Sequence, residues 1–473
     1  MNKRASESKP SADNTPITWD TLPLDARQQA NLVALGFSQM TPIQSATLPS
    51  SLAGRDLIAQ AKTGSGKTAA FGLPLLQGLV TASLQVQALI LCPTRELADQ
   101  VCAEVRRLAR AYENVKVLTL CGGVPLRGQS ASLANGAHVV VGTPGRVLDH
   151  LARGNMSLDA MKVLVLDEAD RMLEMGFADD IQAIAKQSPK QRQTLLFSAT
   201  YPDGIAALAN KLMRDPLMVT VDTVHETHAI EEWFFEVGEA TRLDTVPRLL
   251  NHYQPMSTVA FCNTRAQCND LVAILRGQGF SALTLHGDLD QRDRDQVLVQ
   301  FSNQSCSVLV ATDVAARGLD IADLAAVVNV DTTPDPQIYT HRIGRTGRAG
   351  ASGLALSLVT LPEMSRASRI EEQSGRPLRW QPLTALGVGN SPLKAPMRTL
   401  QIAGGRKEKI RAGDIVGALI GECGLEKDQV GKIALGEFSS YVAVPAAIAF
   451  KVCEALNVGR IKGKRVKVRV LDN

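Results

Sequence analysis

Short, continuous apolar runs recur along most of the chain, separated by segments with helical periodicity. The first series occupies residues 56–59, 88–91, 138–141, 163–166 and 194–197. The second series occupies residues 258–261, 282–285, 308–311, 326–330 and 354–358. Strands that are apolar on both faces are typical of parallel sheets covered by helices on both sides. The two series therefore predict two α/β lobes.

Two breaks interrupt this pattern, one polar and one rich in Pro and Gly, and they suggest the domain organisation. We predict a tail at 1–17, a first lobe at 18–220, an inter-lobe linker at 221–229, a second lobe at 230–380, a loose connector at 381–396 and a C-terminal domain at 397–473. The last segment has the order β-α-β-β-α-β, which is the split βαβ plan of small RRM-like α+β domains.

The composition excludes several classes of protein. With 473 residues, 45% hydrophobic and 21% charged, the chain is not a disordered protein. No apolar run approaches the roughly 18 residues of a membrane-spanning helix, and the polar N-terminus lacks the apolar region of a signal peptide. The eight cysteines form no C-x-x-C pair and no zinc-like cluster, which favours reduced thiols. We therefore expect a cytoplasmic protein with no membrane partner.

Positive charge is concentrated near the C-terminus. Residues 398–473 contain 14 Lys and Arg against 8 Asp and Glu, a net charge of +6, whereas the whole chain carries +4. This asymmetry predicts an anionic partner for the C-terminal domain. A solvated basic surface is the alternative that charge alone leaves open.

Polar segments follow the apolar runs in both halves of the chain. They are 61–68, 93–96, 167–168 and 198–200 in the first lobe, and 263–264, 286–288 and 312–313 in the second. Open α/β sheets bind ligands at the carboxyl ends of their strands. The sequence therefore predicts a functional edge on each lobe.

The segment 61–68 has the features of a phosphate-binding loop, with Ala61 in place of the usual first glycine. We expect its backbone to hold phosphates, through Thr63, Gly64, Ser65, Gly66, Lys67 and Thr68. Lys67 supplies a positive charge and Thr68 a hydroxyl for Mg²⁺. A glycine-serine turn with a solvated lysine is the alternative, and the flanking strand and helix disfavour it.

Two acids, Asp167 and Glu168, end an apolar strand about 100 residues after this loop. Asp167 can hold Mg²⁺, and Glu168 can accept a proton from an attacking water. Alone, such a pair is more often a helix N-cap. The phosphate loop upstream favours the catalytic interpretation.

Asp167-Glu168-Ala169-Asp170 is also the signature of the DEAD-box RNA helicases, which the chain resembles from Trp19 to about Trp380. The resemblance implies two RecA-like lobes that use ATP and Mg²⁺. It implies adenine recognition by three residues that match the family's Q motif: Trp19, Phe37 and Gln44. Two residues depart from that motif, because Trp19 replaces the usual Phe and Met40 the usual Pro.

Other family motifs occur in order and imply contacts with an RNA backbone. The matching residues are Thr94, Arg95, Gly123, Thr143 and Arg146 in the first lobe and Thr264, Gly287, Arg294, Thr312 and Arg317 in the second. Hydroxyls, guanidinium groups and backbone N–H groups suit phosphates and do not read bases. Ser198, Thr200 and His341 match positions that couple ATP hydrolysis to strand separation.

The segment 341–348 is dense in positive charge. The resemblance implies that Arg345 and Arg348 reach the γ-phosphate, with Arg348 as an arginine finger, while Asp320 contacts the ribose. Guanidinium groups stabilise the charge that develops on a transferred phosphoryl group. A basic loop that binds nucleic acid directly is the alternative.

The C-terminal domain is similar to that of the bacterial DEAD-box protein A subgroup, whose tail recognises a hairpin of 23S ribosomal RNA. Its candidate RNA-binding residues are Lys407, Lys409, Arg411, Lys462, Lys464 and Arg465. An RRM usually stacks bases on aromatic residues of its sheet, but here the first strand (399–403) has none and the third has only Tyr441, preceded by Phe438.

Together these features predict an ATP-dependent RNA helicase that unwinds RNA locally and assists assembly of the large ribosomal subunit. The resemblance implies RNA rather than DNA as the partner, and we expect a monomer. An ATP-gated RNA clamp without useful unwinding is the main alternative. An RNA-binding module on an inactive core and a DNA translocase are less compatible with the motifs.

Overall fold

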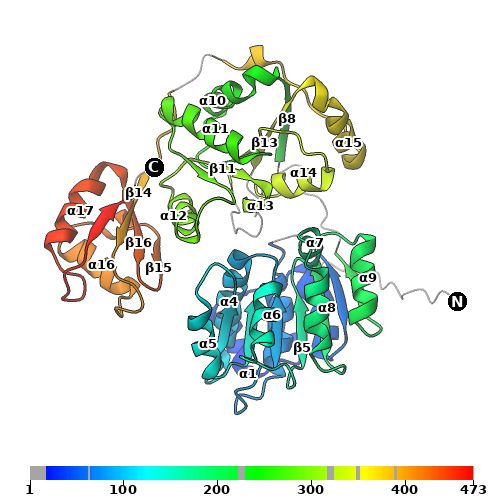
Figure 1. Cartoon of the computed structure of the whole chain (residues 1–473). Coiled ribbons are helices and arrows are strands. Elements are labelled where there is room, and N and C mark those ends of the chain that lie inside the picture. The colour runs from blue at the N-terminus through cyan, green and yellow to red at the C-terminus, as the bar shows by residue number, and fades with distance from the viewer. Residues whose placement is uncertain are drawn as a thin grey trace. The chain divides into compact units, whose positions relative to one another are not determined.

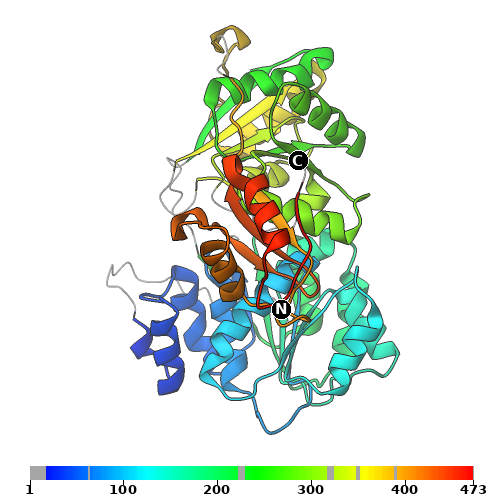
Figure 2. The same ribbon diagram turned by 90° about the vertical axis from the view of Figure 1, so that its left-hand side faces the viewer.

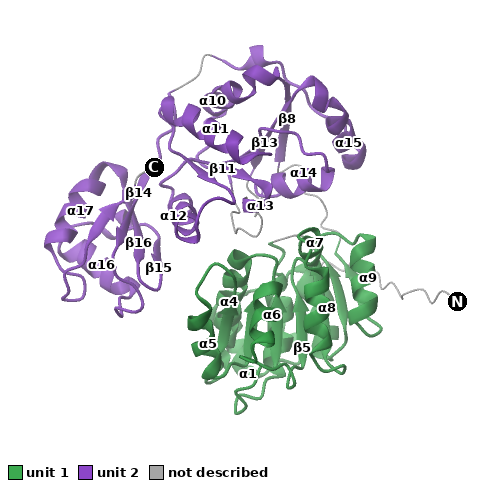
Figure 3. Cartoon of the chain, in the orientation of Figure 1, with its two compact units in different colours: residues 1–225, 318–320 green, residues 226–317, 321–473 purple. Residues whose placement is uncertain are grey.

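The protein, seen in a computed structural model, is described at residues 18–61, 64–221, 230–316, 324–347, 352–387 and 391–471. These residues group into two units (Figure 3). The first unit contains the first lobe. The second contains the second lobe together with the C-terminal domain.

Seven parallel strands form the sheet of the first lobe, in the order β3-β4-β2-β5-β6-β1-β7. Figure 1 shows the central strand β5 of this sheet with α6 and α8 beside it. Their bounds are β1 Leu57–Gln60, β2 Ala88–Leu91, β3 Val117–Leu120, β4 Val139–Gly142, β5 Val163–Leu166, β6 Gln193–Ser198 and β7 Leu217–Thr220. The helices are α1 Ala26–Ala34, α2 Pro42–Leu52, α3 Lys67–Gln77, α4 Arg95–Leu108, α5 Leu126–Ala134, α6 Pro144–Ala152, α7 Ala169–Glu174, α8 Ala178–Lys186 and α9 Asp203–Leu212.

Both faces of this sheet are buried, as the continuous apolar runs predict. On β1, Leu57 and Ala59 enter one hydrophobic core, while Ile58 between them enters the other. Successive residues of a strand point to opposite faces, so a strand that is apolar throughout needs a core on each side.

The second lobe repeats this design with six parallel strands in the order β10-β11-β9-β12-β13-β8. The strands are β8 Ile230–Glu236, β9 Thr258–Cys262, β10 Ala282–Leu285, β11 Val308–Thr312, β12 Ala326–Asn329 and β13 Gly353–Val359. The helices are α10 Arg242–Tyr253, α11 Arg265–Gly277, α12 Gln291–Ser302, α13 Asp313–Ala316, α14 Pro336–Ile343 and α15 Met364–Ser374. The prediction of two parallel α/β lobes is confirmed.

The C-terminal domain has a four-stranded antiparallel sheet in the order β15-β16-β14-β17. Its elements are β14 Met397–Ile402, α16 Ala412–Gly421, β15 Ile433–Leu435, β16 Ser440–Pro445, α17 Ala449–Val458 and β17 Val468–Val470. Figure 2 shows α16 and α17 side by side, and both helices share a core with Leu400 and Ile402 of β14. The predicted RRM-like plan is confirmed.

The segment after Gln381, predicted to be a loose connector, is packed over part of its length. Leu383 and Leu386 contact the core of the second lobe, and the N–H of Gly387 donates to His252 Nδ1 at 3.1 Å. Residues 388–390 lie outside the described part of the chain, as do residues 1–17 and 222–229 of the predicted tail and inter-lobe linker.

Two expectations from composition can be compared with the described residues. Within them, no helix is both long and apolar enough to cross a membrane. The eight cysteines are free thiols, and six of them are buried.

Candidate nucleotide and RNA sites

The predicted phosphate loop connects β1 to α3. Gly64 and Gly66 have φ angles of +84° and +89°, which residues with a side chain rarely adopt. A Cβ atom added to Gly66 would lie 2.5 Å from Gln44 Nε2, so a side chain there would displace the Gln44 amide. Lys67 begins α3, which places the loop at the N-terminus of a helix, where backbone N–H groups favour anions. Thr63 lies outside the described residues.

Gln44 is buried beneath this loop and supports it. Its Nε2 donates to the carbonyl of Gly66 at 3.0 Å, and its Oε1 accepts from the N–H of Thr41 at 2.8 Å. Nearby, the rings of Trp19 and Phe37 meet edge to face with centroids 5.9 Å apart. The structure thus gives Gln44 a supporting role, while its pairing with adenine stays a prediction.

The ammonium group of Lys67 is the buried cation of this site. Its Nζ lies 3.8 Å from Asp167 Oδ1, and it makes no hydrogen bond to any described residue. Burying an ammonium group whose N–H donors lack acceptors costs free energy, unless an anion binds to it. Lys67 is therefore suited to a phosphate ligand.

Asp167 and Glu168 lie where β5 ends and α7 begins, and both are buried. Burial raises the pKa of Asp167 to about 6; Lys67 opposes this shift and the charge of Glu168 adds to it. Glu168 has a φ of +52°, an uncommon conformation for a non-glycine residue and one that clusters at functional sites. Its Oε2 lies 3.5 Å from Arg171 Nε.

The oxygens of Asp167 and Thr68 are hard ligands of the kind that Mg²⁺ prefers. Among the described residues, no group of three His, Cys, Asp or Glu side chains could hold a metal ion. Mg²⁺ usually binds through one or two carboxylates plus substrate phosphates and waters, so these residues fit a metal that arrives with a nucleotide.

Asp170 has a role that sequence reasoning missed. Its Oδ2 accepts hydrogen bonds from Ala199 N at 3.1 Å, Thr200 N at 2.9 Å and Thr200 Oγ1 at 3.0 Å. Its own N–H donates to Ser198 Oγ at 3.3 Å. Asp170 therefore joins the acidic segment to the predicted coupling residues at the end of β6. Its position in the four-residue signature was the only sequence signal.

The predicted RNA-facing residues of the first lobe lie at the carboxyl edge of its sheet. Thr94 caps α4 by accepting from Leu97 N at 3.3 Å, and Thr143 precedes α6. Gly123 is exposed with a φ of +76°, and Arg146 Nη1 donates to Val124 O at 3.1 Å. Arg95, at the start of α4, lies 3.5 Å from Asp99. Capping hydroxyls and helix N-termini at one edge are compatible with phosphate binding.

The second lobe has a comparable arrangement. Thr264 caps α11 by accepting from Gln267 N at 3.2 Å, and Thr312 ends β11. Arg294 Nη2 donates to Ala315 O at 2.7 Å. A Cβ at Gly287 would lie 3.5 Å from the guanidinium of Arg265. Arg317 and Asp320 lie outside the described residues.

The residues of the basic segment 341–348, which begins in the last turn of α14, have either structural or candidate catalytic roles. Arg342, to which sequence reasoning gave no role, is buried and donates to both carboxylate oxygens of Asp313 at 2.7 Å. It also lies over the ring of Phe261 at 5.1 Å. His341 lies in α14 and Arg345 just after it, whereas Arg348 is outside the described residues.

The structure brings together basic residues of the C-terminal domain that are far apart in sequence. Lys462 Nζ donates to the carbonyl of Lys409 and lies 3.5 Å from Asp414. The loops 406–411 and 460–465 therefore lie side by side, and we call them the basic loop pair. The loop pair contains all six predicted RNA-binding residues of this domain. Lys464 and Arg465 are exposed within it.

The sheet of this domain is partly covered by the second lobe. Thr399 Oγ1 on β14 accepts from Asn303 Nδ2 at 3.1 Å and lies 2.7 Å from Ser305 Oγ, and all three residues are buried. Beside them, Tyr441 is half-buried and Phe438 is 64% exposed with Lys407 over its ring. A base-stacking surface across the sheet is therefore limited, as the scarcity of aromatic residues predicts.

Three protein families match successive parts of the chain. Residues 41–208 match the DEAD/DEAH box helicase family, and residues 241–350 match the helicase conserved C-terminal domain. Residues 399–470 match the DbpA RNA binding domain. The three matches follow the order of the two lobes and the C-terminal domain.

Known proteins resemble the chain in sequence and in fold. ATP-dependent RNA helicase DbpA of Escherichia coli is 52% identical over 448 residues, which cover 95% of this chain and 98% of that protein. ATP-dependent RNA helicase CshA of Listeria monocytogenes is 46% identical over 76% of this chain and 69% of its own length. The structure of S. cerevisiae Dbp5 bound to RNA and ADP BeF3 has a TM-score of 0.70 at 32% identity, over 77% of this chain and 96% of that one. The chain therefore belongs to the DEAD-box ATP-dependent RNA helicases that carry a DbpA RNA-binding domain.

Proposed function

We propose that the basic loop pair directs this helicase to a hairpin of 23S ribosomal RNA, where the two lobes unwind nearby RNA during assembly of the large ribosomal subunit. The proposal includes Mg²⁺ as the metal that accompanies ATP, a monomeric enzyme and the cytoplasm as the place of action. The observation that carries it is the convergence of 406–411 and 460–465 on one surface of a domain that matches the DbpA RNA binding domain.

The chemistry of the lobes supports the same proposal. Candidate RNA contacts of both lobes come from hydroxyls, guanidinium groups and helix N-termini, which contact phosphates and do not distinguish sequences. A core of this kind needs a separate element to choose its RNA. The C-terminal domain offers that element, because its six candidate residues lie on loops outside the covered sheet.

The nucleotide chemistry is assigned residue by residue. Lys67 contacts the phosphates, Asp167 and Thr68 hold the metal, and Glu168 orients the attacking water and takes its proton. Mg²⁺ supplies charge neutralisation for the phosphates when it is bound. Arg345 and Arg348 stabilise charge on the transferred phosphoryl group.

A double variant of the basic loop pair tests the proposed target. We expect Lys464→Ala with Arg465→Ala to weaken binding to a 23S ribosomal RNA hairpin at least about tenfold, because each lost phosphate or base contact contributes about 1–3 kcal/mol. Stimulation of ATPase by unstructured poly-A should stay within about twofold of the parent. The measurement is the ATPase rate against concentration for each RNA.

The matched control is Lys427→Ala with Lys451→Ala, which removes two exposed charges from the same domain outside the loop pair. It should leave the preference for the hairpin intact. Equal stimulation of the parent by the hairpin, an unrelated structured RNA and poly-A would contradict the ribosomal target. The core activity would still stand.

A second variant tests the coupling role of Ser198 and Thr200. Ser198→Ala with Thr200→Val removes one acceptor and one donor from Asp170 while keeping the two backbone donors. We expect RNA-stimulated ATPase within about threefold of the parent and duplex release at least about tenfold slower. The Thr200 bond to the Asp170 carboxylate contributes about 1.5–3 kcal/mol, and the Ser198 bond to the Asp170 N–H about 0.5–1.5 kcal/mol. Fluorescent duplex release and phosphate production measure the two activities.

Ser188→Ala with Thr220→Val makes the same chemical change elsewhere in the first lobe and should alter neither activity. A parallel fall of both activities in the Ser198 and Thr200 variant would assign these residues to hydrolysis itself. A matching loss of thermal stability would assign them to folding.

A further inference from the structure

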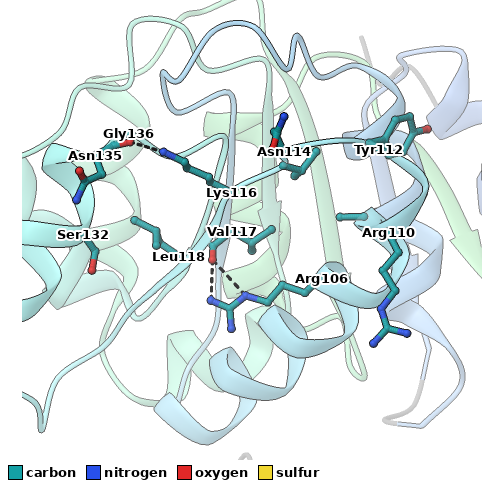
Figure 4. A pocket seen from close by; sticks show the side chains of 12 residues that line it. Arg106, Arg110, Tyr112, Asn114, Lys116, Val117, Leu118, Ser132, Asn135 and Gly136 are labelled. Atoms are coloured by element: carbon teal, nitrogen blue, oxygen red, sulfur yellow. Dashed lines mark hydrogen bonds between the residues drawn. The ribbon is translucent and has the colours of Figure 1, made fainter. Parts of the chain in front are cut away.

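A pocket of about 590 Å³ lies in the first lobe, far along the chain from the phosphate loop (Figure 4). Its lining residues come from α4, the segment 109–116, the start of β3, the end of α5 and the turn between α5 and β4. Lys116 directly precedes β3, and Asn135 lies shortly before β4. The pocket therefore opens at the amino ends of these parallel strands, whereas the nucleotide and RNA residues lie at the carboxyl ends.

Three cationic side chains surround this pocket: Arg106, Arg110 and Lys116. Arg106 is fixed in place, because its Nε and Nη2 donate to the carbonyl of Val117 at 3.3 and 2.7 Å (Figure 4). Lys116 is fixed by a 2.7 Å bond from Nζ to the carbonyl of Asn135. Both cations are thus oriented by backbone oxygens that carry no full charge, and both keep further donors.

The cations of the pocket lack acidic partners. No Asp or Glu is among the residues that line it. Arg110 makes no hydrogen bond or ion pair with any residue in the described ranges. Elsewhere on the same helix the pattern differs, since Arg107 pairs with Glu104 at 2.6 Å. Three positive charges around one concave surface repel one another, and a bound anion would offset this repulsion.

The remaining lining residues add neutral donors to this charge. Asn114 and Asn135 offer amide groups, although one N–H of Asn135 Nδ2 already donates to Ala131 O at 2.9 Å and the hydroxyl of Ser132 donates to Gly128 O at 3.0 Å. Val115 and Leu118 line the pocket with apolar surface. A phosphate presents three acceptor oxygens and can be reached from several directions at once. Guanidinium and ammonium groups together with neutral donors are typical of phosphate recognition.

We propose that this pocket is a second anion site, which binds phosphate groups. The phosphate belongs either to a small phosphorylated molecule or to the backbone of an RNA segment outside the predicted groove. The site is independent of the proposed ribosomal target, because it lies in the first lobe. An acidic protein segment is a different ligand class and is treated as an outcome that overturns the proposal.

The test uses the full chain with Arg110→Ala and Lys116→Ala, which leaves the Arg106 contact to Val117 in place. The control carries Arg55→Ala and Lys190→Ala, exposed residues that precede β1 and β6 at the same edge of the sheet and do not line the pocket. Both variants lose two positive charges. A non-hydrolysable ATP analogue fills the nucleotide site, and inorganic pyrophosphate is titrated by calorimetry. We expect binding at least about tenfold weaker in the pocket variant only.

The second arm measures binding of double-stranded RNA against salt concentration. If the RNA backbone occupies the pocket, the slope of log K against log salt becomes shallower by about one to two in the pocket variant and stays unchanged in the control. Loss of pyrophosphate binding with an unchanged slope identifies a small phosphorylated ligand. Equal results for the parent and both variants would overturn the proposal. The proposal would also be overturned if binding of a poly-glutamate peptide required Arg110 and Lys116 while binding of neither phosphate probe did.

Discussion

Replacing Lys67 with alanine is expected to lower ATP turnover by at least about a hundredfold, the usual cost of losing one charged or hydrogen-bonding group that stabilises a transition state. The structure gives the physical reason. The Lys67 ammonium is buried and makes no hydrogen bond within the described residues, and its Nζ lies 3.8 Å from Asp167 Oδ1. Its donors are free for the phosphates of a nucleotide.

The loss should not come from unfolding. Since a buried ammonium without hydrogen bonds already costs free energy, its removal relieves part of that cost. Without Lys67, the pKa of Asp167 should rise further, because the charge of Lys67 lowers it more than the backbone hydrogen bond from Glu168 does. A thermal melt should therefore change by only a few degrees while RNA-stimulated phosphate release falls. Lys190→Ala, an exposed lysine of the same lobe, is the control.

Turnover within about threefold of the parent would contradict the assignment of Lys67 to the phosphates. A collapse of the melting temperature would instead give Lys67 a structural role.

The interior strands were predictable because burial on both faces leaves an unbroken apolar run. Three strands escaped prediction, and each lies at an edge of its sheet: β3, β7 and β8. An edge strand has one neighbour and is partly exposed, so polar residues can interrupt its apolar pattern, although the edge strand β10 was predicted from its run at 282–285. In β8, for example, Glu231 and Glu232 follow Ile230 directly. The hydrophobic signal is weakest where a strand has least contact with the core.

The positions of Lys67, Asp167 and Glu168 could be predicted because a loop or a strand end fixes them locally. The roles that could not be predicted depend on partners distant in sequence. Asp170 binds residues about 30 positions away, and Arg342 binds Asp313 from the preceding helix. Such contacts exist only after the strands assemble, so no local spacing reveals them.

The C-terminal domain shows the same limit in a different form. Its order of elements is visible in the sequence, because hydrophobic periodicity is a local property. The burial of Thr399 against Asn303 and Ser305 is not visible in the sequence. These three polar residues form their buried hydrogen bonds only when β14 packs against the segment after α12.

Replacing Glu168 with glutamine is expected to preserve ATP binding and to lower turnover by about 10²–10⁴-fold, the range for loss of a general base. Glutamine keeps the size of the side chain and an oxygen that can remain near Arg171 Nε, but it cannot take a proton from water at neutral pH. The change is therefore confined to the proton-accepting function.

Asp167 gives this prediction a further consequence. The charge of Glu168 raises the pKa of Asp167, so a neutral glutamine should lower that pKa and keep Asp167 more fully ionised. A fully ionised Asp167 binds a cation better, so the affinity for ATP with Mg²⁺ should stay equal or increase while hydrolysis falls. Equilibrium binding of a fluorescent ATP analogue and single-turnover hydrolysis measure the two effects separately.

Glu113→Gln neutralises an exposed carboxylate of the same lobe and should change neither quantity. Unchanged single-turnover hydrolysis in the Glu168 variant would remove this residue as the base. A joint loss of binding and hydrolysis would place Glu168 in the nucleotide contacts instead. Retained binding with lost hydrolysis is the outcome that the buried, adjacent pair of carboxylates predicts, because only one of the two is needed to hold the metal and the other is left to accept the proton.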